Sequence, residues 1–443
     1  MQSLLSVKEK EGRGGKNCRF FLEKTENRAK RRREKDNFFQ GKAVETGQRK
    51  RNGKMNGFLL ALQKTKSQRD LKESRRGGTI KETTKKPQLA PSERGRERGR
   101  STVKKVLMLT TGGTIASKRT SEGLEPLLSG EELLRDLGSA ARHYDITVRE
   151  LLNLDSSNIQ AEEWQKIARA AAEGMDAHDG VLITHGTDTM AYTASMLSFM
   201  LQNLKKPVVL TGSQVPIDHM LTDARNNLCT ALAAIDSGIR GVSIAFNHKV
   251  LTGCRAVKVR TMGFEAFESV NAPCLGEVYA NGMHVRRTTD VPAERQGLPF
   301  CLRDTYSPDV FLLKMIPGTN PEIFDLFLKM HYRGLVIEAF GAGGMHFVRR
   351  DLFAKLRQLT AQGISVVVCS QCLYEPSDLS LYEVGTRMLS CGVIPGLDMT
   401  TEAAVTKMMW ALGQTDDPAE VRRMFSTNYA GEITLGGAKN WTD

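Results

Sequence analysis

Short apolar runs alternate with helix-length segments along residues 104–443, and this alternation restricts the fold more than any other feature of the sequence. Apolar runs that are each followed by a helical pattern are typical of βαβ units and predict parallel sheets. The runs are continuously apolar, as expected where helices cover both faces of a sheet. They lie at Val106–Leu109, Val181–Thr184, Pro207–Leu210, Val242–Phe246, Val310–Ile316, Gly334–Phe340 and Ile364–Cys369. The sequence therefore predicts the α/β class with mainly parallel sheets.

The alternation is interrupted over residues 282–307, where helical and strand periodicity are both weak. A chain of 443 residues is expected to form more than one domain, because single cores stop growing beyond about 250–300 residues. We therefore expect a larger N-terminal α/β domain at residues 104–290, a linker at residues 291–307 and a smaller C-terminal α/β domain at residues 308–443.

Residues 1–103 differ from the rest of the chain in charge. They hold 30 Lys and Arg against 12 Asp and Glu, a net charge of +18, whereas residues 104–443 carry a net charge of −5. High net charge with little to bury predicts a disordered basic extension. Three interpretations stay open. The extension can be a tail that binds RNA, an acidic surface or a nuclear import receptor. It can also be a solvated tail without a role, or the result of a start codon assigned upstream of a true beginning at Met55 or later. The mildly acidic remainder needs no nucleic-acid partner.

The sequence predicts neither a secretory leader nor a membrane span. Charged residues follow the N-terminus too soon for a leader, and no stretch reaches the ~20 apolar residues of a membrane helix, so we expect a soluble cytoplasmic protein. The one close cysteine pair, Cys369 and Cys372, lacks the second pair that a zinc site needs. We therefore expect buried reduced thiols and no metal.

Two loops rich in Thr and Gly directly follow apolar runs. They are Thr110–Ala116 (TTGGTIA) and His185–Thr189 (HGTDT). Ligands of open α/β sheets bind beyond the carboxyl ends of the strands, so the two loops predict a site for a small anionic or carbonyl substrate. Gly112 and Gly113 suit a tight turn or an anion cradle. A phosphate loop needs a lysine after its last glycine, where Thr114 stands, which disfavours nucleotide binding.

Thr187 and Asp188 open a helical pattern and allow two interpretations. Thr and Asp are preferred at helix N-termini, so both can be capping residues. Alternatively, Asp188 binds the ammonium group of an amino-acid substrate while the Thr187 hydroxyl acts at the reacting carbon. A threonine hydroxyl needs a base. Lys258 is the candidate, because its small and apolar neighbours would desolvate it and favour the neutral amine.

Thr110–Ala116 and Thr184–Tyr192 resemble the two signature motifs of the bacterial-type L-asparaginase family. The resemblance extends from about Lys104 to Thr434 and is greatest to the cytoplasmic, type I branch. Further landmarks follow in the family's order, at Leu154–Asn158, Leu210–Pro216, Gly263–Ser269, Val336–Gly344 and Ser370–Cys372. The two-domain α/β organisation expected above is also the architecture of that family.

The resemblance implies roles for the matching catalytic residues. Thr114 matches the primary nucleophile, which forms an aspartyl ester with the acyl group of the substrate side chain. Thr187, Asp188 and Lys258 match a second catalytic cluster. In that cluster lysine polarises threonine, aspartate orients lysine or meets the substrate amine, and water completes the hydrolysis.

The resemblance also implies a substrate site, an assembly and the lack of a cofactor. Ser156 matches the residue that binds the substrate α-carboxylate, and Asp155 beside it contacts the amino group. Gly186 belongs to the same substrate-binding set, with Thr187 and Asp188. The family needs no cofactor. Its members are usually homodimers or homotetramers, with active sites completed near a subunit interface.

Two positions depart from the family pattern. Many members carry a tyrosine on a flexible lid after the first signature, and Leu124 stands in its place. Leucine cannot relay a proton, so another hydroxyl, a water or Lys258 has to activate Thr114, or catalysis is weaker than in relatives. Glu338 stands where some type I relatives bind allosteric asparagine with an arginine, and Gly344 stands at their nearby asparagine. Allosteric activation is therefore not expected.

Together, these features predict an amidohydrolase that converts L-asparagine to L-aspartate and ammonia through a threonine nucleophile and an acyl-enzyme intermediate. L-glutamine is a second candidate substrate. One alternative is the glutaminase subunit of a tRNA-dependent amidotransferase, which resembles this family. Another is a non-catalytic amino-acid-binding protein, against which the intact threonines, Asp188 and Lys258 argue.

Overall fold

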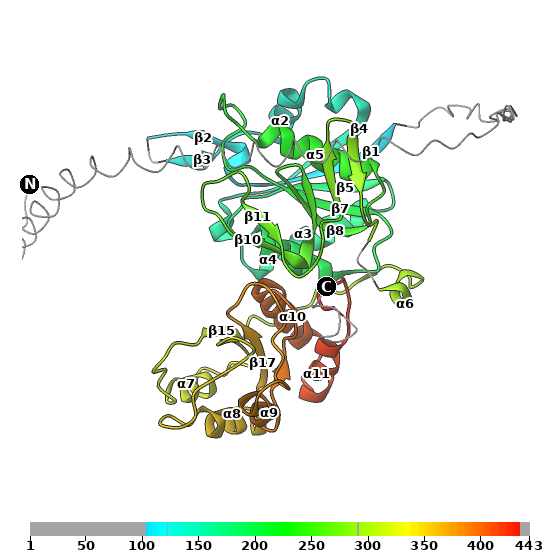
Figure 1. Cartoon of the computed structure of the whole chain (residues 1–443). Helices are drawn as coiled ribbons and strands as arrows, with labels where there is room; N and C mark the ends of the chain where they lie inside the picture. The colour runs from blue at the N-terminus through cyan, green and yellow to red at the C-terminus, as the bar shows by residue number, and fades with distance from the viewer. Residues whose placement is uncertain (1–102, 122, 290–291, 435–443) are drawn as a thin grey trace, which may run out of the picture. The chain divides into compact units, whose positions relative to one another are not determined.

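The computed structural model describes residues 103–121, 123–289 and 292–434 (Figure 1). The extension expected at residues 1–103 therefore falls, apart from Val103, outside the described residues. None of the described helices is both long and apolar enough to cross a membrane.

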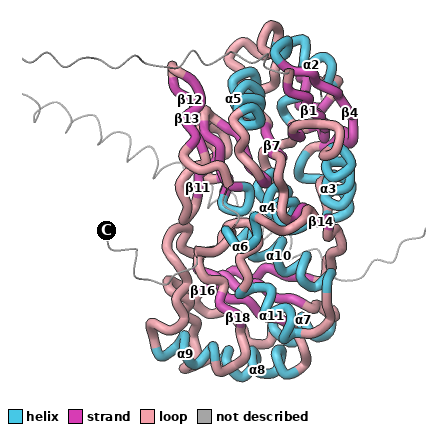
Figure 2. Tube along the Cα trace, turned by 90° about the vertical axis from the view of Figure 1, so that its right-hand side faces the viewer, coloured by secondary structure: helices cyan, strands magenta, loops and turns pink. Residues whose placement is uncertain are grey.

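The larger sheet contains eight strands of the described chain, in the order β13-β12-β9-β8-β7-β5-β1-β4 (Figures 1 and 2). Neighbouring strands from β4 to β8 pair in parallel. These five are β4 (Tyr144–Leu154), β1 (Lys104–Gly112), β5 (Gly180–Thr184), β7 (Pro207–Thr211) and β8 (Gly241–Phe246). The antiparallel side of the sheet consists of β9 (Lys249–Thr252), β12 (Gly276–Tyr279) and β13 (Gly282–Val285).

Helices cover both faces of this sheet, and the side chains of β1 alternate between them. Val106 and Met108 lie in the apolar core under α2 (Gly130–Leu137) and α5 (Ala224–Asp236). Leu107 and Leu109 lie in the opposite core, under α3 (Ala161–Gly174) and α4 (Met190–Met200). Burial on both sides explains why the parallel strands read as continuous apolar runs.

The smaller sheet contains four strands of the described chain, all parallel, in the order β15-β16-β17-β18. They are β15 (Val310–Lys314), β16 (Gly334–Ala339), β17 (Ser365–Ser370) and β18 (Ile394–Pro395). One face packs on α7 (Ile323–Lys329), α8 (Leu352–Ala361) and α9 (Glu383–Leu389), and the other on α10 (Thr401–Gln414) and α11 (Pro418–Ser426). The α/β class with mainly parallel sheets is thus confirmed.

Polar side chains cap the starts of several helices. Ser129 forms a capping box with Glu132 at α2, in which each side chain bonds the other residue's backbone N–H. The side chains of Asp351, Thr400 and Asp417 accept backbone N–H bonds at the starts of α8, α10 and α11. Such caps satisfy N–H groups that the first helical turn leaves without partners, which fixes where the helices begin.

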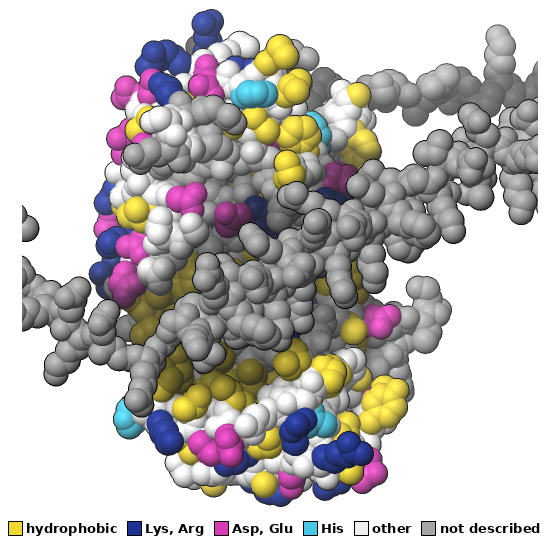
Figure 3. All heavy atoms as spheres, turned by 90° about the vertical axis from the view of Figure 1, so that its left-hand side faces the viewer, with side chains coloured by type: hydrophobic (Ala, Val, Ile, Leu, Met, Phe, Trp, Pro, Cys, Tyr) yellow, Lys and Arg dark blue, Asp and Glu magenta, His cyan; other side chains and the backbone are white. Residues whose placement is uncertain are grey.

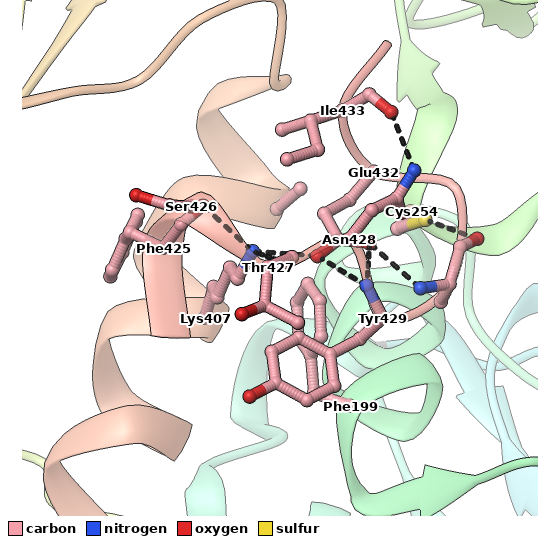
Figure 4. A network of polar contacts seen from close by, with 12 residues as sticks. Phe199, Cys254, Lys407, Phe425, Ser426, Thr427, Asn428, Tyr429, Glu432 and Ile433 are labelled. Carbon is pink, nitrogen blue, oxygen red and sulfur yellow. Dashed lines mark hydrogen bonds and ion pairs between the residues drawn. The ribbon is translucent and has the colours of Figure 1, made fainter. Parts of the chain in front are cut away.

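Helix α10 joins the two sheets through one shared core. Trp410 stacks on Phe199 of α4, with ring centroids 5.9 Å apart. Lys407, also on α10, is fully buried and donates to the carbonyl oxygen of Thr427 (2.8 Å) and to Glu432 (2.6 Å; Figure 4). Burial alone would raise the pKa of Glu432, but the Lys407 ammonium and backbone N–H groups outweigh it and lower that pKa.

A second buried ion pair joins the end of the described chain to the short segment that follows β9. Arg255 lies in the short 3-10 helix η4 (Gly253–Arg255), just before β10 (Ala256–Lys258). Its guanidinium donates to the carboxylate of Asp398 (3.0 Å), to the carbonyl oxygen of Gly431 (2.7 Å) and to Thr434 Oγ1 (3.3 Å). The segment after α11 is therefore fastened to the strand that carries Lys258.

The stretch predicted as a linker contains two short elements, α6 (Ala293–Gln296) and β14 (Cys301–Leu302), and β14 pairs with β6 (Leu201–Gln202). The prediction of buried thiols is wrong for Cys372, which is exposed although Cys369 is buried. The reason is that Cys369 lies inside β17, whereas Cys372 follows its end.

Candidate functional site

The site forms where four parallel strands end side by side. The loop after β1 carries Thr114, the loop after β4 carries Asp155 and Ser156, and the loop after β5 carries residues 185–189. The loop after β7 begins at Gly212. Because β4, β1, β5 and β7 are parallel neighbours, these loops all emerge at one edge of the sheet.

Three of these loops touch through their backbones. A Cβ atom on Gly113 would lie 2.4 Å from the Cα atom of Gly186. A Cβ atom on Gly186 would in turn lie 2.6 Å from Ser156 Oγ. Gly113 also has φ +81°, a conformation that side chains other than glycine rarely adopt, and its N–H donates to the Leu154 carbonyl (3.0 Å). The glycines therefore bring the two signature loops and Ser156 together.

Thr114 is the first residue of the 3-10 helix η1 (Thr114–Ala116) and is partly exposed. Its hydroxyl has no hydrogen-bond partner among the described residues. Neighbouring hydroxyls instead hold the loop: Thr111 Oγ1 donates to the Thr184 carbonyl (2.9 Å), and Ser117 Oγ donates to the Gly113 carbonyl (2.9 Å). Thr114 is thus the hydroxyl of this loop that is free to meet a ligand.

Asp155 and Ser156 lie beside these loops, at the start of the 3-10 helix η3 (Ser156–Asn158). Asp155 caps this helix by accepting the N–H of Ser157 (2.8 Å) and is itself exposed. Ser156 is buried, and its carbonyl oxygen accepts from Thr189 Oγ1 (2.7 Å). The structure therefore places the Ser156 hydroxyl next to Gly186, with the exposed Asp155 carboxylate on the residue before it.

Thr187, Asp188 and Lys258 form one connected cluster. Lys258 Nζ donates to Thr187 Oγ1 (2.8 Å) and to the Asp188 carboxylate (2.5 Å). The Lys258 side chain is 15% exposed, whereas that of Asp188 is 64% exposed. The cluster therefore places a nearly buried ammonium against a hydroxyl, with a carboxylate open to solvent.

The capping interpretation of Thr187 and Asp188 is wrong. Helix α4 begins at Met190, its N-cap residue is Thr189, and no side chain makes a capping hydrogen bond there. Thr187 and Asp188 lie before the helix, and their side chains turn to Lys258 because β10 brings its ammonium within reach.

A buried histidine network, which the sequence did not reveal, supports the second loop. His185 Nδ1 lies 2.7 Å from the Gly186 carbonyl oxygen, so it carries the proton and donates. Nε2 is then the acceptor for Thr193 Oγ1 (2.9 Å), which itself accepts from Trp164 Nε1–H (2.9 Å). Full burial lowers the pKa of His185 to about 4, although its bond to Gly186 opposes the shift. The ring is therefore neutral at pH 7.

Gln214 is a further residue of the site to which the sequence analysis gave no role. Its Oε1 accepts from Thr187 Oγ1 (3.2 Å), and its Nε2 donates to the carbonyl oxygens of Thr261 and Gly263 (both 3.1 Å). The signal was present, because Gln214 follows an apolar run that ends beside the second loop.

The positions that depart from the family pattern lie outside this cluster. Leu124 begins β3 (Leu124–Pro126), which pairs with β2 (Ser117–Arg119) in a hairpin; its side chain is not among those described. Glu338 lies in β16, where it accepts from Thr401 Oγ1 (2.6 Å) and pairs with Lys314 (3.2 Å). Gly344 forms an isolated bridge with Phe340.

The chemistry available is that of hydroxyls, one ammonium and carboxylates. Within the described ranges, no three His, Cys, Asp or Glu side chains gather in a group that could hold a metal ion. A free threonine hydroxyl on a glycine-rich turn and a second hydroxyl bound by lysine suit acyl transfer.

Comparison with known proteins agrees with this chemistry. Residues 105–291 match the family described as "Asparaginase, N-terminal", and residues 309–425 match "Glutaminase/Asparaginase C-terminal domain". The L-asparaginase of Thermococcus kodakarensis is 44% identical over 333 residues, covering 74% of this chain and 99% of that protein. A subunit of the glutamyl-tRNA(Gln) amidotransferase of Pyrococcus horikoshii is 37% identical over 339 residues, covering 74% of this chain and 76% of that protein.

A solved structure agrees with these sequence matches. The thermostable L-asparaginase from Thermococcus kodakarensis superposes with a TM-score of 0.70 at 42% sequence identity, covering 75% of this chain and 100% of that one. Sequence and structure therefore match along nearly the whole length of this relative, and the chain belongs to the asparaginase family.

Proposed function

We propose that this protein hydrolyses L-asparagine to L-aspartate and ammonia. Thr114 Oγ1 attacks the side-chain amide carbon of the substrate. The C–N bond then breaks, and ammonia leaves with the proton that the hydroxyl gave up. Water attacks the resulting aspartyl ester, which releases L-aspartate and restores the Thr114 hydroxyl. The Thr114 hydroxyl has no hydrogen-bond partner among the described residues, so a water molecule takes the proton that the hydroxyl loses and passes it to the leaving ammonia.

The contact of Lys258 with Thr187 is the observation that carries this proposal. An ammonium 2.8 Å from a hydroxyl polarises it and supplies positive charge where the tetrahedral intermediate develops negative charge. Asp188, 2.5 Å from the same ammonium, holds it in place and leaves an exposed carboxylate for the substrate ammonium group.

Ser156, Asp155 and Gly186 are proposed to hold the substrate backbone. The Ser156 hydroxyl suits the α-carboxylate, and the exposed Asp155 carboxylate suits the α-ammonium group. Gly186 contributes by lacking a side chain, since a Cβ atom there would collide with Ser156.

The test is kcat/KM for L-asparagine against L-glutamine, measured as ammonia release by the full chain. Faster release from L-asparagine supports the proposal. A preference for L-glutamine favours the amidotransferase-type glutaminase, a function that the name of the Pyrococcus horikoshii relative makes worth testing. No release from either amide would make the protein a non-catalytic amino-acid-binding protein.

Three further features are part of the proposal. The protein acts without a cofactor. It forms homodimers or homotetramers: Met262 and Phe264, on the segment after Lys258, are exposed, and apolar side chains reach the surface on the face drawn in Figure 3. Sedimentation velocity tests this assembly.

A cytoplasmic location fits the seven described cysteines, which are all free thiols.

A further inference from the structure

The side-chain amide of Gln214 has a single orientation that satisfies its surroundings. Two backbone carbonyl oxygens, of Thr261 and Gly263, each lie 3.1 Å from one end of the amide. Carbonyl oxygens only accept, so that end is the NH₂ group, and both of its protons are used. The other end is therefore the oxygen, and it faces Thr187 Oγ1 at 3.2 Å.

This orientation fixes the direction of the Thr187 hydroxyl. An amide oxygen carries no proton, so the Thr187 hydroxyl donates its only proton to Gln214. The lone pairs of Thr187 Oγ1 then accept from Lys258 Nζ at 2.8 Å. The donors run in one order, from Lys258 to Thr187 to Gln214.

The backbone of Gln214 is held as firmly as its side chain. Its N–H donates to both carboxylate oxygens of Asp223, at 3.1 and 3.0 Å. The same carboxylate accepts from Val215 N–H (3.1 Å) and from Asn227 Nδ2 (2.9 Å). Asn227 also donates to the Gly212 carbonyl (2.9 Å), so the loop after β7 is fastened to α5. These hydrogen bonds therefore hold the backbone of Gln214 in place beside Thr187.

We infer that Gln214 is a positioning residue that holds the Thr187 hydroxyl as an acceptor from Lys258 and ties the segment after Lys258 to the site. Without the Gln214 oxygen, the Thr187 hydroxyl loses the acceptor that fixes its direction and can rotate away from the orientation in which it accepts from Lys258. Without the Gln214 nitrogen, the carbonyl groups of Thr261 and Gly263 lose their donor. The inference rests on the proposed function only for its kinetic consequence.

The first experiment measures turnover of the Gln214→Met variant, which keeps the length of the side chain and removes its polar atoms. We expect kcat for L-asparagine to fall about 10- to 100-fold while KM changes less than about 3-fold, because a misdirected catalytic group costs rate more than binding. Gln414→Met is the matched control, since Gln414 Nε2 also donates to several acceptors away from the site, two on Thr305 and the carbonyl oxygen of Trp410. Unchanged kcat in Gln214→Met, or an equal loss in Gln414→Met, overturns the inference.

The pH dependence of kcat in the Gln214→Glu variant tests whether the hydrogen bonds of Gln214, and not only its packing, support turnover. Its ionised carboxylate can still accept from Thr187 but repels the two carbonyl oxygens, whereas the protonated carboxyl can donate to one of them. Its kcat relative to the parent should therefore rise as pH falls. A ratio independent of pH contradicts the inference.

A third measurement separates this inference from the proposed function. Crystal structures of the parent and of Gln214→Met give the distance from Lys258 Nζ to Thr187 Oγ1 and the path of the backbone from Thr261 to Gly263. Without the Gln214 amide, we expect that distance to lengthen from 2.8 Å and that backbone segment to shift. If the parent shows no turnover, the proposed function fails, and this comparison still decides the role of Gln214. An unchanged distance and an unchanged backbone refute that role.

Discussion

Gly113 and Gly186 pack backbone against backbone, so closely that a Cβ atom on Gly113 would lie 2.4 Å from both the Cα and the N atom of Gly186. The first residue precedes Thr114 and the second precedes Thr187. The distance between the two threonine-bearing loops is therefore set by the absence of side chains, in addition to the hydrogen bonds around them.

Replacing Gly113 with alanine should separate these loops. We expect Gly113→Ala to lower kcat/KM for L-asparagine by at least about 100-fold, because displacements near 1 Å at a site cost about that much. Gly238→Ala is the control, since Gly238 also has positive φ (+77°) but open space where its Cβ would lie. The control should cost about 1–2 kcal/mol of folding stability and leave turnover intact. Equal effects on turnover would show that the close contact is unimportant.

The roles of the threonines and their partners predict different kinetic losses. Thr114→Ala and Lys258→Ala should each abolish measurable ammonia release, because one removes the nucleophile and the other the charge beside Thr187. Asp188→Ala should mainly raise KM. Thr386→Ala, on α9, serves as the control and should retain full activity. Substantial turnover by Thr114→Ala would overturn the assignment of the nucleophile.

Burial of neutral His185 predicts a loss of stability in acid. Its pKa is about 4 in the folded chain and 6.5 as a free side chain. The unfolded chain therefore takes up a proton first, and the free energy of unfolding should fall by about 3 kcal/mol as pH drops from about 6.5 to about 4. Urea midpoints at pH 7 and pH 4.5 measure this loss. His185→Asn keeps a donor near Nδ1 and should show a smaller difference; an equal difference would exclude His185 as the cause.

The buried pair of Lys407 and Glu432 predicts that a single variant loses more folding stability than the double variant. Lys407→Met leaves a carboxylate uncompensated in the core and should cost about 3–5 kcal/mol of stability. Adding Glu432→Gln removes that charge and keeps one oxygen acceptor for the backbone N–H groups of Tyr429 and Ala430, so the double variant should recover part of the loss. Arg149→Met is the control, because Arg149 pairs with Glu173 at the surface and should contribute less than about 1 kcal/mol. Chemical denaturation compares all four proteins.

The buried parallel strands could be predicted from the sequence, whereas the edge strands could not. β5 and β7 are buried at every residue, so continuous apolar runs identified them. β4 lies at the sheet edge and is nowhere buried, so its sequence of mixed polar and apolar residues gave no such signal. The short antiparallel strands β12 and β13 are also partly exposed and were missed for the same reason.

The candidate site was predictable as a set of residue types but not as an arrangement. Thr187 and Asp188 fitted helix capping equally well from sequence, and only the position of Lys258, about 70 residues later, decides between the interpretations. Gln214 and His185 act through contacts that depend on which loops become neighbours. Periodicity within one segment carries no information on such contacts.

Arg255 also makes the ordering of the strand that bears Lys258 depend on residues that are synthesised much later. Its partners Asp398, Gly431 and Thr434 are made more than 140 residues after it. A buried guanidinium without partners is strongly unfavourable, so the segment from η4 to β10 cannot take up its final packing until those partners have been made. A chain that stops before residue 398 should therefore lack an ordered lysine strand even though every residue named in the site has been translated.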